Sequence, residues 1–167
     1  AELFINGKSY GKQSKNNSSL KSRYRLMWMD AVYEPGEVKV VAYNKDGKAV
    51  AEKTVRTAGK PHHIELVSNR NELTADGKGL AYVTVKVVDK DGNLCPTDSR
   101  LIHFSVKGAG KFRAVANGDP TNLEQFHLPK MHAFHGMLTA IVQAGEIAGD
   151  LVLTAKASGV KTGTVHL

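Results

Sequence analysis

Cysteine is almost absent from this sequence of 167 residues, and the single Cys95 excludes a disulfide within the chain. Long apolar runs are absent as well, since no stretch approaches the roughly 20 residues of a membrane-spanning helix. Charged residues make up 23% and hydrophobic residues 41% of the chain, which is the composition of a folded globular protein and not of a disordered one.

Acidic residues are missing from one stretch of the chain. Residues 1–59 carry 11 basic and 6 acidic side chains, whereas residues 60–167 carry 12 and 10, and no acid lies between Lys8 and Arg25. A nucleic-acid site would interleave such cations with stacking aromatic rings on a defined module. Here the cations lie in and around the polar segment 13–19, so we interpret this stretch as a solvated loop and predict no nucleic-acid partner.

Helical periodicity is also lacking, and the alternation of period two that marks half-buried strands recurs instead. In residues 80–89 the side chains of Ala81, Val83 and Val85 share one face, while the other face begins with Tyr82 and Thr84 and ends with Val88. An Asp-Gly turn ending at Gly92 follows directly. The sequence therefore predicts an all-β protein without a helix.

Turn residues divide the chain near residues 58–61. The strands predicted upstream are residues 2–6, 24–29, 37–43 and 49–57, and those predicted downstream are 63–68, 80–89, 101–106, 111–116, 133–143, 151–157 and 162–167. An immunoglobulin-type sandwich takes about seven strands. We therefore expect two immunoglobulin-like β-sandwich domains in tandem, residues 1–58 and 59–167. The first is expected to be truncated at its N-terminus, with its first strand at an unpaired edge.

A loop over residues 117–132 is too long for a simple hairpin. Asn117 and Asp119 belong to an Asn-Gly-Asp-Pro turn, so we expect their side chains to order the loop through bonds to nearby backbone. Phe126, Leu128 and Met131 are apolar where hairpin loops are usually polar. The prediction is that this apolar tip packs on another domain of a larger protein.

Metal and cofactor sites are not predicted. Asp119 and Glu124 could hold a cation through oxygen atoms, but the ligand ladder of a calcium loop is missing. His127, His132 and His135 invite a zinc interpretation, yet an odd separation along a strand places two of them on opposite faces. We interpret the carboxylates as part of a structural turn and the histidines as surface residues.

Three aromatic residues, Tyr24, Trp28 and Tyr33, form the one plausible platform for a sugar. If residues 24–29 are a strand, Tyr24, Leu26 and Trp28 share a face, and one face of that strand must supply core. Tryptophan is on average highly buried, so core packing competes with carbohydrate contact at these positions.

Short segments stand in a fixed order along the chain. The first group is ELFINGKSYG at 2–11, YEPGEVKVVAY at 33–43 and TVRTAG at 54–59, and the second group is LTADG at 73–77, AYVTV at 81–85, DKDGN at 89–93 and VANGDPT at 115–121. Together they resemble the end of bacterial glycoside hydrolase family 2 enzymes of the β-galactosidase kind. The first group is similar to the domain that follows the catalytic barrel, and the second to the bacterial immunoglobulin-like domain that ends many such enzymes.

The resemblance implies a noncatalytic accessory region whose partner is the catalytic barrel of a longer parent enzyme. In that family two glutamates of the barrel perform the chemistry; no catalytic residue is carried over to this chain, and no cofactor is implied. The resemblance also implies a periplasmic or secreted bacterial protein. Two other functions stay open, a stand-alone carbohydrate-binding module and a tandem immunoglobulin-like repeat of an adhesin.

Overall fold

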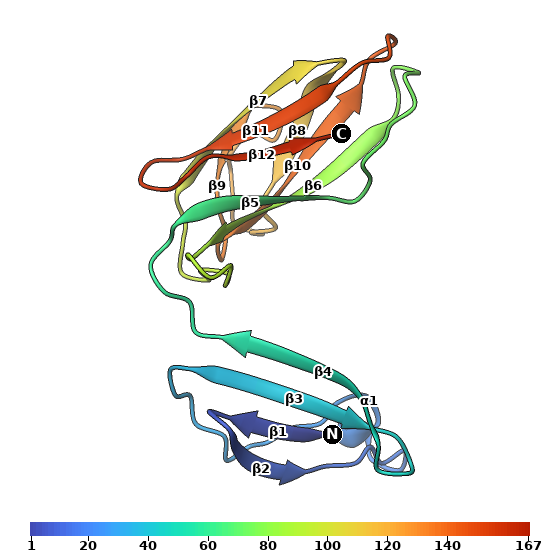
Figure 1. Cartoon of the computed structure of the whole chain (residues 1–167), viewed down its shortest axis with the longest axis vertical. Helices are drawn as coiled ribbons and strands as arrows, with labels where there is room; N and C mark the ends of the chain where they lie inside the picture. Colours follow the sequence, from blue (N-terminus) through green and yellow to red (C-terminus); the bar gives the residue numbers. More distant parts are fainter. The chain divides into compact units, whose positions relative to one another are not determined.

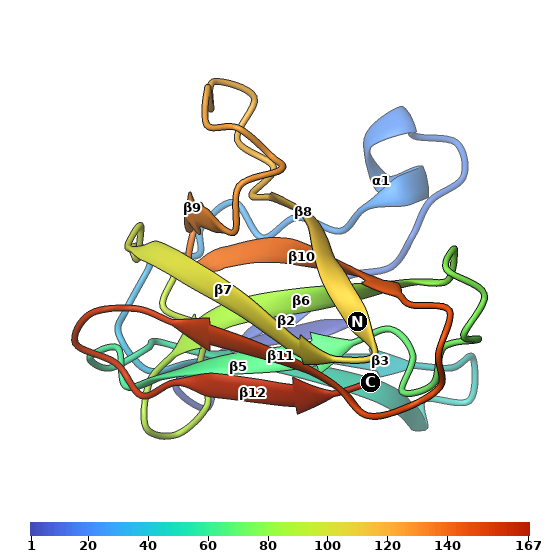
Figure 2. The ribbon, with the colours of Figure 1, turned by 90° about the horizontal axis from the view of Figure 1, so that it is seen from above.

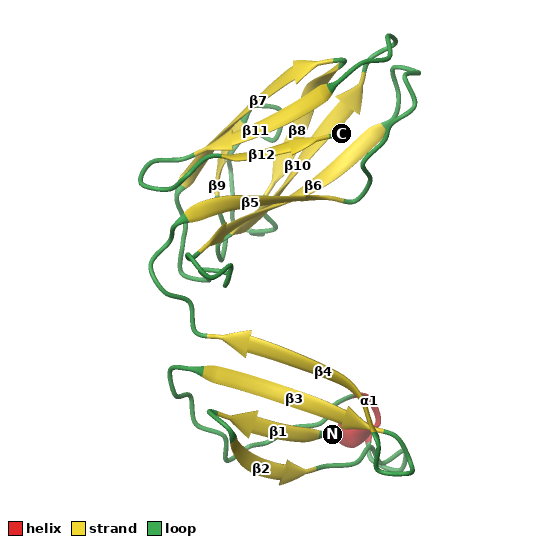
Figure 3. Cartoon of the chain, in the orientation of Figure 1, coloured by secondary structure: helices red, strands yellow, loops and turns green.

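The computed structural model describes all residues from Ala1 to Leu167, and they form two compact units, Ala1–Thr57 and Ala58–Leu167. Strands make up nearly all of the regular structure, and α1 is the only helix (Figure 3). The all-β prediction is therefore confirmed. With five residues, α1 is too short to span a membrane.

The first unit is one antiparallel sheet of four strands in the order β2-β1-β3-β4 (Figure 1). Its elements are β1 (Glu2–Ile5), β2 (Lys8–Lys12), α1 (Leu20–Tyr24), β3 (Glu37–Tyr43) and β4 (Ala49–Arg56). Asn6 and Gly7 both have positive φ, 49° and 81°, as a two-residue turn between β1 and β2 requires. The Asn6 side chain then accepts a bond from the backbone N–H of Glu37 at 2.8 Å, which ties this turn to the start of β3.

Three predictions for the first unit are wrong. β1 lies between β2 and β3, so the first strand is not at an edge. Residues 24–29 form no strand, because no neighbouring strand pairs with them. The chain also contains the short helix α1, which includes Tyr24, although the sequence predicts no helix; Ser19 caps it by accepting a bond from the backbone N–H of Ser22.

The second unit is a sandwich of two four-stranded sheets. One sheet has the order β5-β6-β10-β8 and the other β12-β11-β7-β9 (Figure 2). The strands of this unit are β5 (His63–Ser68), β6 (Leu80–Val88), β7 (Leu101–Gly108), β8 (Gly110–Ala116), β9 (Lys130–His132), β10 (Met137–Ala144), β11 (Leu151–Lys156) and β12 (Gly163–His166).

The core of the second unit lies between its two sheets. Val83, Val85 and Val142 contribute from one sheet, and Ile102 and Leu153 from the other, all fully buried. The alternation predicted for β6 is confirmed, because the side chains of its Ala81–Val87 face are all fully buried. Facing apolar rows of this kind stabilise a sandwich through the area they remove from water.

Candidate functional site

The long loop between β8 and β10 is ordered by its own polar side chains. Asn117 Nδ2 donates to the carbonyl of His132 at 3.0 Å and so joins the two ends of the loop. The Asp119 carboxylate accepts from the backbone N–H of Thr121 at 2.8 Å and from its hydroxyl at 2.7 Å. These two bonds lower the pKa of Asp119. Asn117 and Asp119 therefore make the bonds to nearby backbone that the sequence predicts.

A carboxylate–imidazole pair closes the same loop further along. Glu124 Oε1 lies 3.0 Å from His132 Nδ1, and Glu124 Oε2 accepts the backbone N–H of His132 at 3.1 Å. The backbone N–H of Val115 also donates to the carbonyl of Phe126 at 2.8 Å. The loop thus rises from β8 and β9 as a bonded structure (Figure 2).

The apolar tip of the loop differs from the predicted set. Phe126 is 56% exposed, as a docking residue would be, but Leu128 is only half-exposed and Met131 is fully buried in the core of its own unit. Met131 is buried because it belongs to β9 and pairs with Ile102 of β7. Leu123, which lies outside the predicted apolar set, is 96% exposed. The exposed apolar side chains of the tip are therefore Leu123 and Phe126.

The three histidines do not converge. His132 pairs with Glu124, His135 lies 3.2 Å from the carbonyl of Pro96 through Nδ1, and His127 is exposed. No group of three His, Cys, Asp or Glu side chains in the chain is arranged to hold a metal ion.

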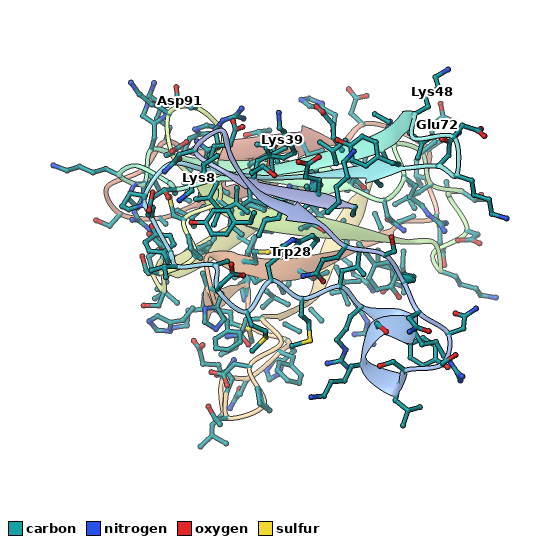
Figure 4. The ribbon with its side chains drawn as sticks, turned by 90° about the horizontal axis from the view of Figure 1, so that it is seen from below. Lys8, Trp28, Lys39, Lys48, Glu72 and Asp91 are labelled. Atoms are coloured by element: carbon teal, nitrogen blue, oxygen red, sulfur yellow. The ribbon has the colours of Figure 1, made fainter.

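Tyr24, Trp28 and Tyr33, the predicted aromatic platform, do not lie together on the face of a strand. Tyr24 and Tyr33 are largely exposed, whereas Trp28 is half-buried. The Trp28 indole N–H donates to the carbonyl of Gly11 in β2 at 2.9 Å, so this ring is fixed beside the edge strand of the first sheet (Figure 4). The Tyr33 hydroxyl lies 3.2 Å from the Thr57 hydroxyl instead of beside Trp28.

Three glutamates of the sheets, Glu2, Glu37 and Glu65, bond to residues of neighbouring strands. Glu37 pairs with Arg56 at 2.6 Å and Glu65 with Lys86 at 3.1 Å, both between neighbouring strands. Glu2 accepts bonds from the hydroxyls of Ser9 and Tyr43. Such positions link strands and do not form a pair flanking a sugar-sized site.

Comparison with known families gives a match over most of the chain. Residues 64–166 match the family described as glycoside hydrolase family 2 C-terminal domain 5. Residues 1–51 match a second family, described as a domain of unknown function (DUF4982).

Similar proteins are much longer than this chain. The β-galactosidase BoGH2A of Bacteroides ovatus is 42% identical over 99% of this chain and 19% of its own length. A β-glucuronidase of Formosa agariphila is 27% identical over 99% of this chain and 16% of its own. The crystal structure of a glycosyl hydrolase family 2 member from Bacteroides cellulosilyticus matches with a TM-score of 0.85 at 32% identity, over 99% of this chain and 22% of that one. The chain thus spans about a fifth of the relatives it matches.

Proposed function

Because this chain belongs to glycoside hydrolase family 2 as a noncatalytic C-terminal region, we propose that it supports the catalytic barrel of an enzyme that hydrolyses β-galactosides. The observation that carries the proposal is the match across both units to a β-galactosidase, at 42% identity over 99% of the chain. The general acid/base and the nucleophile lie outside these residues, in the barrel of the parent enzyme.

The bonded loop of the second unit supports a role in docking. Its tip carries Leu123 and Phe126 exposed to solvent while its base is held by Asn117, Asp119 and Glu124. A preordered loop loses little conformational entropy when its apolar tip is buried against a partner. We propose that this partner is another domain of the parent enzyme.

A stand-alone carbohydrate-binding module is less well supported. Such a module would present Trp28 as an exposed flat ring to a sugar. Trp28 is half-buried, and its indole N–H is already bonded to Gly11. The adhesin alternative does not account for the family 2 match over residues 64–166.

A hydrolysis assay tests the proposal. The parent enzyme and the 167-residue chain are incubated at equal concentration with an aryl β-galactoside and, separately, with an aryl β-glucuronide. The parent is expected to release aryl alcohol from the galactoside, and the chain alone is expected to match the buffer blank. Turnover that copurifies with the chain would overturn the accessory role, and a parent active only on the glucuronide would overturn the proposed substrate.

A further inference from the structure

The segment after α1 in the first unit has the side-chain pattern of a strand without a strand partner. Arg25, which ends the helix, is extended at φ −147° and ψ 157°. From there Leu26 and Trp28 are half-buried, while Met27 and Met29 are exposed. Alternation of this kind is typical of a strand that covers a core with one face.

One edge of this segment is occupied by the side chain of Gln13. Gln13 Nε2 donates to the carbonyl of Met27 at 2.7 Å, and Gln13 Oε1 accepts the backbone N–H of Met27 at 3.3 Å. The backbone groups of successive residues in an extended chain point to opposite sides. The N–H and C=O groups of Leu26 and Trp28 therefore point away from Gln13.

That opposite edge is almost free of bonds. Neither the backbone N–H nor the carbonyl of Leu26 has a protein partner, and the N–H of Trp28 has none either. The carbonyl of Trp28 accepts only a long bond of 3.4 Å from Ala31. Such an edge can pair with an incoming strand.

One face of the four-stranded sheet is buried over β1 and exposed over β4. The ladder places Ile5 opposite Val38, and Val38 opposite Val55, so these three side chains form one row across β1, β3 and β4. Ile5 is 5% exposed, Val38 is half-buried and Val55 is 62% exposed. Burial along this row therefore decreases from β1 to β4, and the apolar side chain on β4 is left exposed.

We propose that a β-strand from the part of the parent polypeptide outside residues 1–167 pairs with the Leu26–Trp28 edge and covers Val38 and Val55. This inference rests on the proposed function. A sheet needs another layer against its apolar face, and only a strand offers both ladder bonds for Leu26 and Trp28 and apolar side chains for the valines. Since the chain spans 19% of BoGH2A, such a parent has ample chain to supply this strand.

Amide hydrogen exchange of the backbone N–H groups of Leu26 and Trp28 tests the proposal. The measurement compares the parent enzyme with the 167-residue chain, and at least about tenfold slower exchange is expected in the parent. Val55→Lys in the parent should reverse this protection by placing a charge under the strand. Val50→Lys is the matched control, because Val50 is 61% exposed on the same strand but lies unpaired at the bulge between its neighbours Ala49 and Ala51.

Both variants should leave the melting temperature of the isolated chain unchanged, which separates loss of docking from a failure to fold. Equal exchange at Leu26 and Trp28 in the two proteins would overturn the proposal. The proposal would also be overturned if these two N–H groups became protected in the isolated chain as its concentration rises, and if sedimentation showed a dimer. In that case a second copy of the chain would occupy the edge. Because exchange does not depend on activity, failure of the proposed function would show separately in the hydrolysis assay.

Discussion

Asp89 at the end of β6 is a buried carboxylate whose partners are all N–H groups. It accepts bonds from the backbone of Gly59 at 2.8 Å, of Asp91 at 2.9 Å and of Asn93 at 2.8 Å, and from the Asn93 side chain. The bond from Gly59 and then that from the Asn93 amide hold the pKa of Asp89 far below its ordinary value. One side chain thereby fixes both the Asp-Gly turn and the first residues of the second unit.

Replacing Asp89 with Asn should lower the melting temperature and flatten its dependence on acid. A carboxyl group whose pKa is lowered by folding stabilises the fold at pH values above its unfolded-state pKa of about 3.9. This contribution is lost as the pH falls from that value toward the lower pKa of the folded state. Melting curves from pH 2 to pH 7 should therefore show a smaller acid-induced decline in D89N than in the unmodified chain. Asp91→Asn in the same turn is the control, and equal decline in all three proteins would contradict the prediction.

Single residues were predictable from sequence where the neighbours along the chain decide their environment. The buried face of β6 follows from period-two alternation, and the bonds of Asn117 and Asp119 follow from the chemistry of a local turn. The sequence places Met131 at the exposed loop tip, whereas its burial depends on pairing with Ile102, which is distant in the sequence. Non-local pairing of this kind leaves no local signal.

Element boundaries were predictable for long strands and not for short or unpaired ones. β3 and β5 have the predicted bounds, because each is a run of strand-forming residues between turn signals. β2 was missed because its residues are polar and largely exposed, although Asn6-Gly7 marks a hairpin. The predicted strand at 24–29 does not form because no other strand pairs with it. The period of the hydrophobic pattern and the strand propensity of the residues do not show whether such a partner exists.

The loop tip between β8 and β10 gives a prediction at the level of one element. Leu123→Ser together with Phe126→Ser should leave the melting temperature of the isolated chain nearly unchanged, because exposed side chains contribute within about 0.5 kcal/mol. In the parent enzyme the same pair should lower the melting temperature by removing a docked apolar tip. Differential scanning calorimetry of both proteins provides the measurement.

The control for the loop is Ile147→Ser, which removes a similarly exposed apolar side chain, 81% exposed, from a different turn of the same unit. If the double variant and this control shift the parent equally, the tip of the 117–132 loop has no specific partner.

At the scale of the whole molecule, the buried apolar residues are divided unequally between the two units. Only Leu3 and Ile5 are buried in the first unit, whereas the second has a continuous core that draws on both of its sheets. Burial of apolar area is the main favourable term in folding. A single sheet with little buried area should therefore be the less stable unit.

Amide hydrogen exchange measured over the whole isolated chain tests whether the first unit is less stable than the second. The amides of β1 and β3 should exchange faster than those of β6 and β10, which lie inside the first sheet of the sandwich. Equal protection of the two pairs of strands in a strict monomer would show that the first unit is stabilised by something other than its own core.

The sole tryptophan of the chain, Trp28, lies in the first unit, and its indole N–H is bonded to the edge strand β2. Intrinsic fluorescence excited at the red edge of the absorption band therefore reports on the first unit alone, whereas the ellipticity of the strands reports on both. Trp28 is thus an intrinsic fluorescent probe of the first unit. Unfolding of the first unit can be followed spectroscopically in the intact chain, without cutting it or attaching a dye.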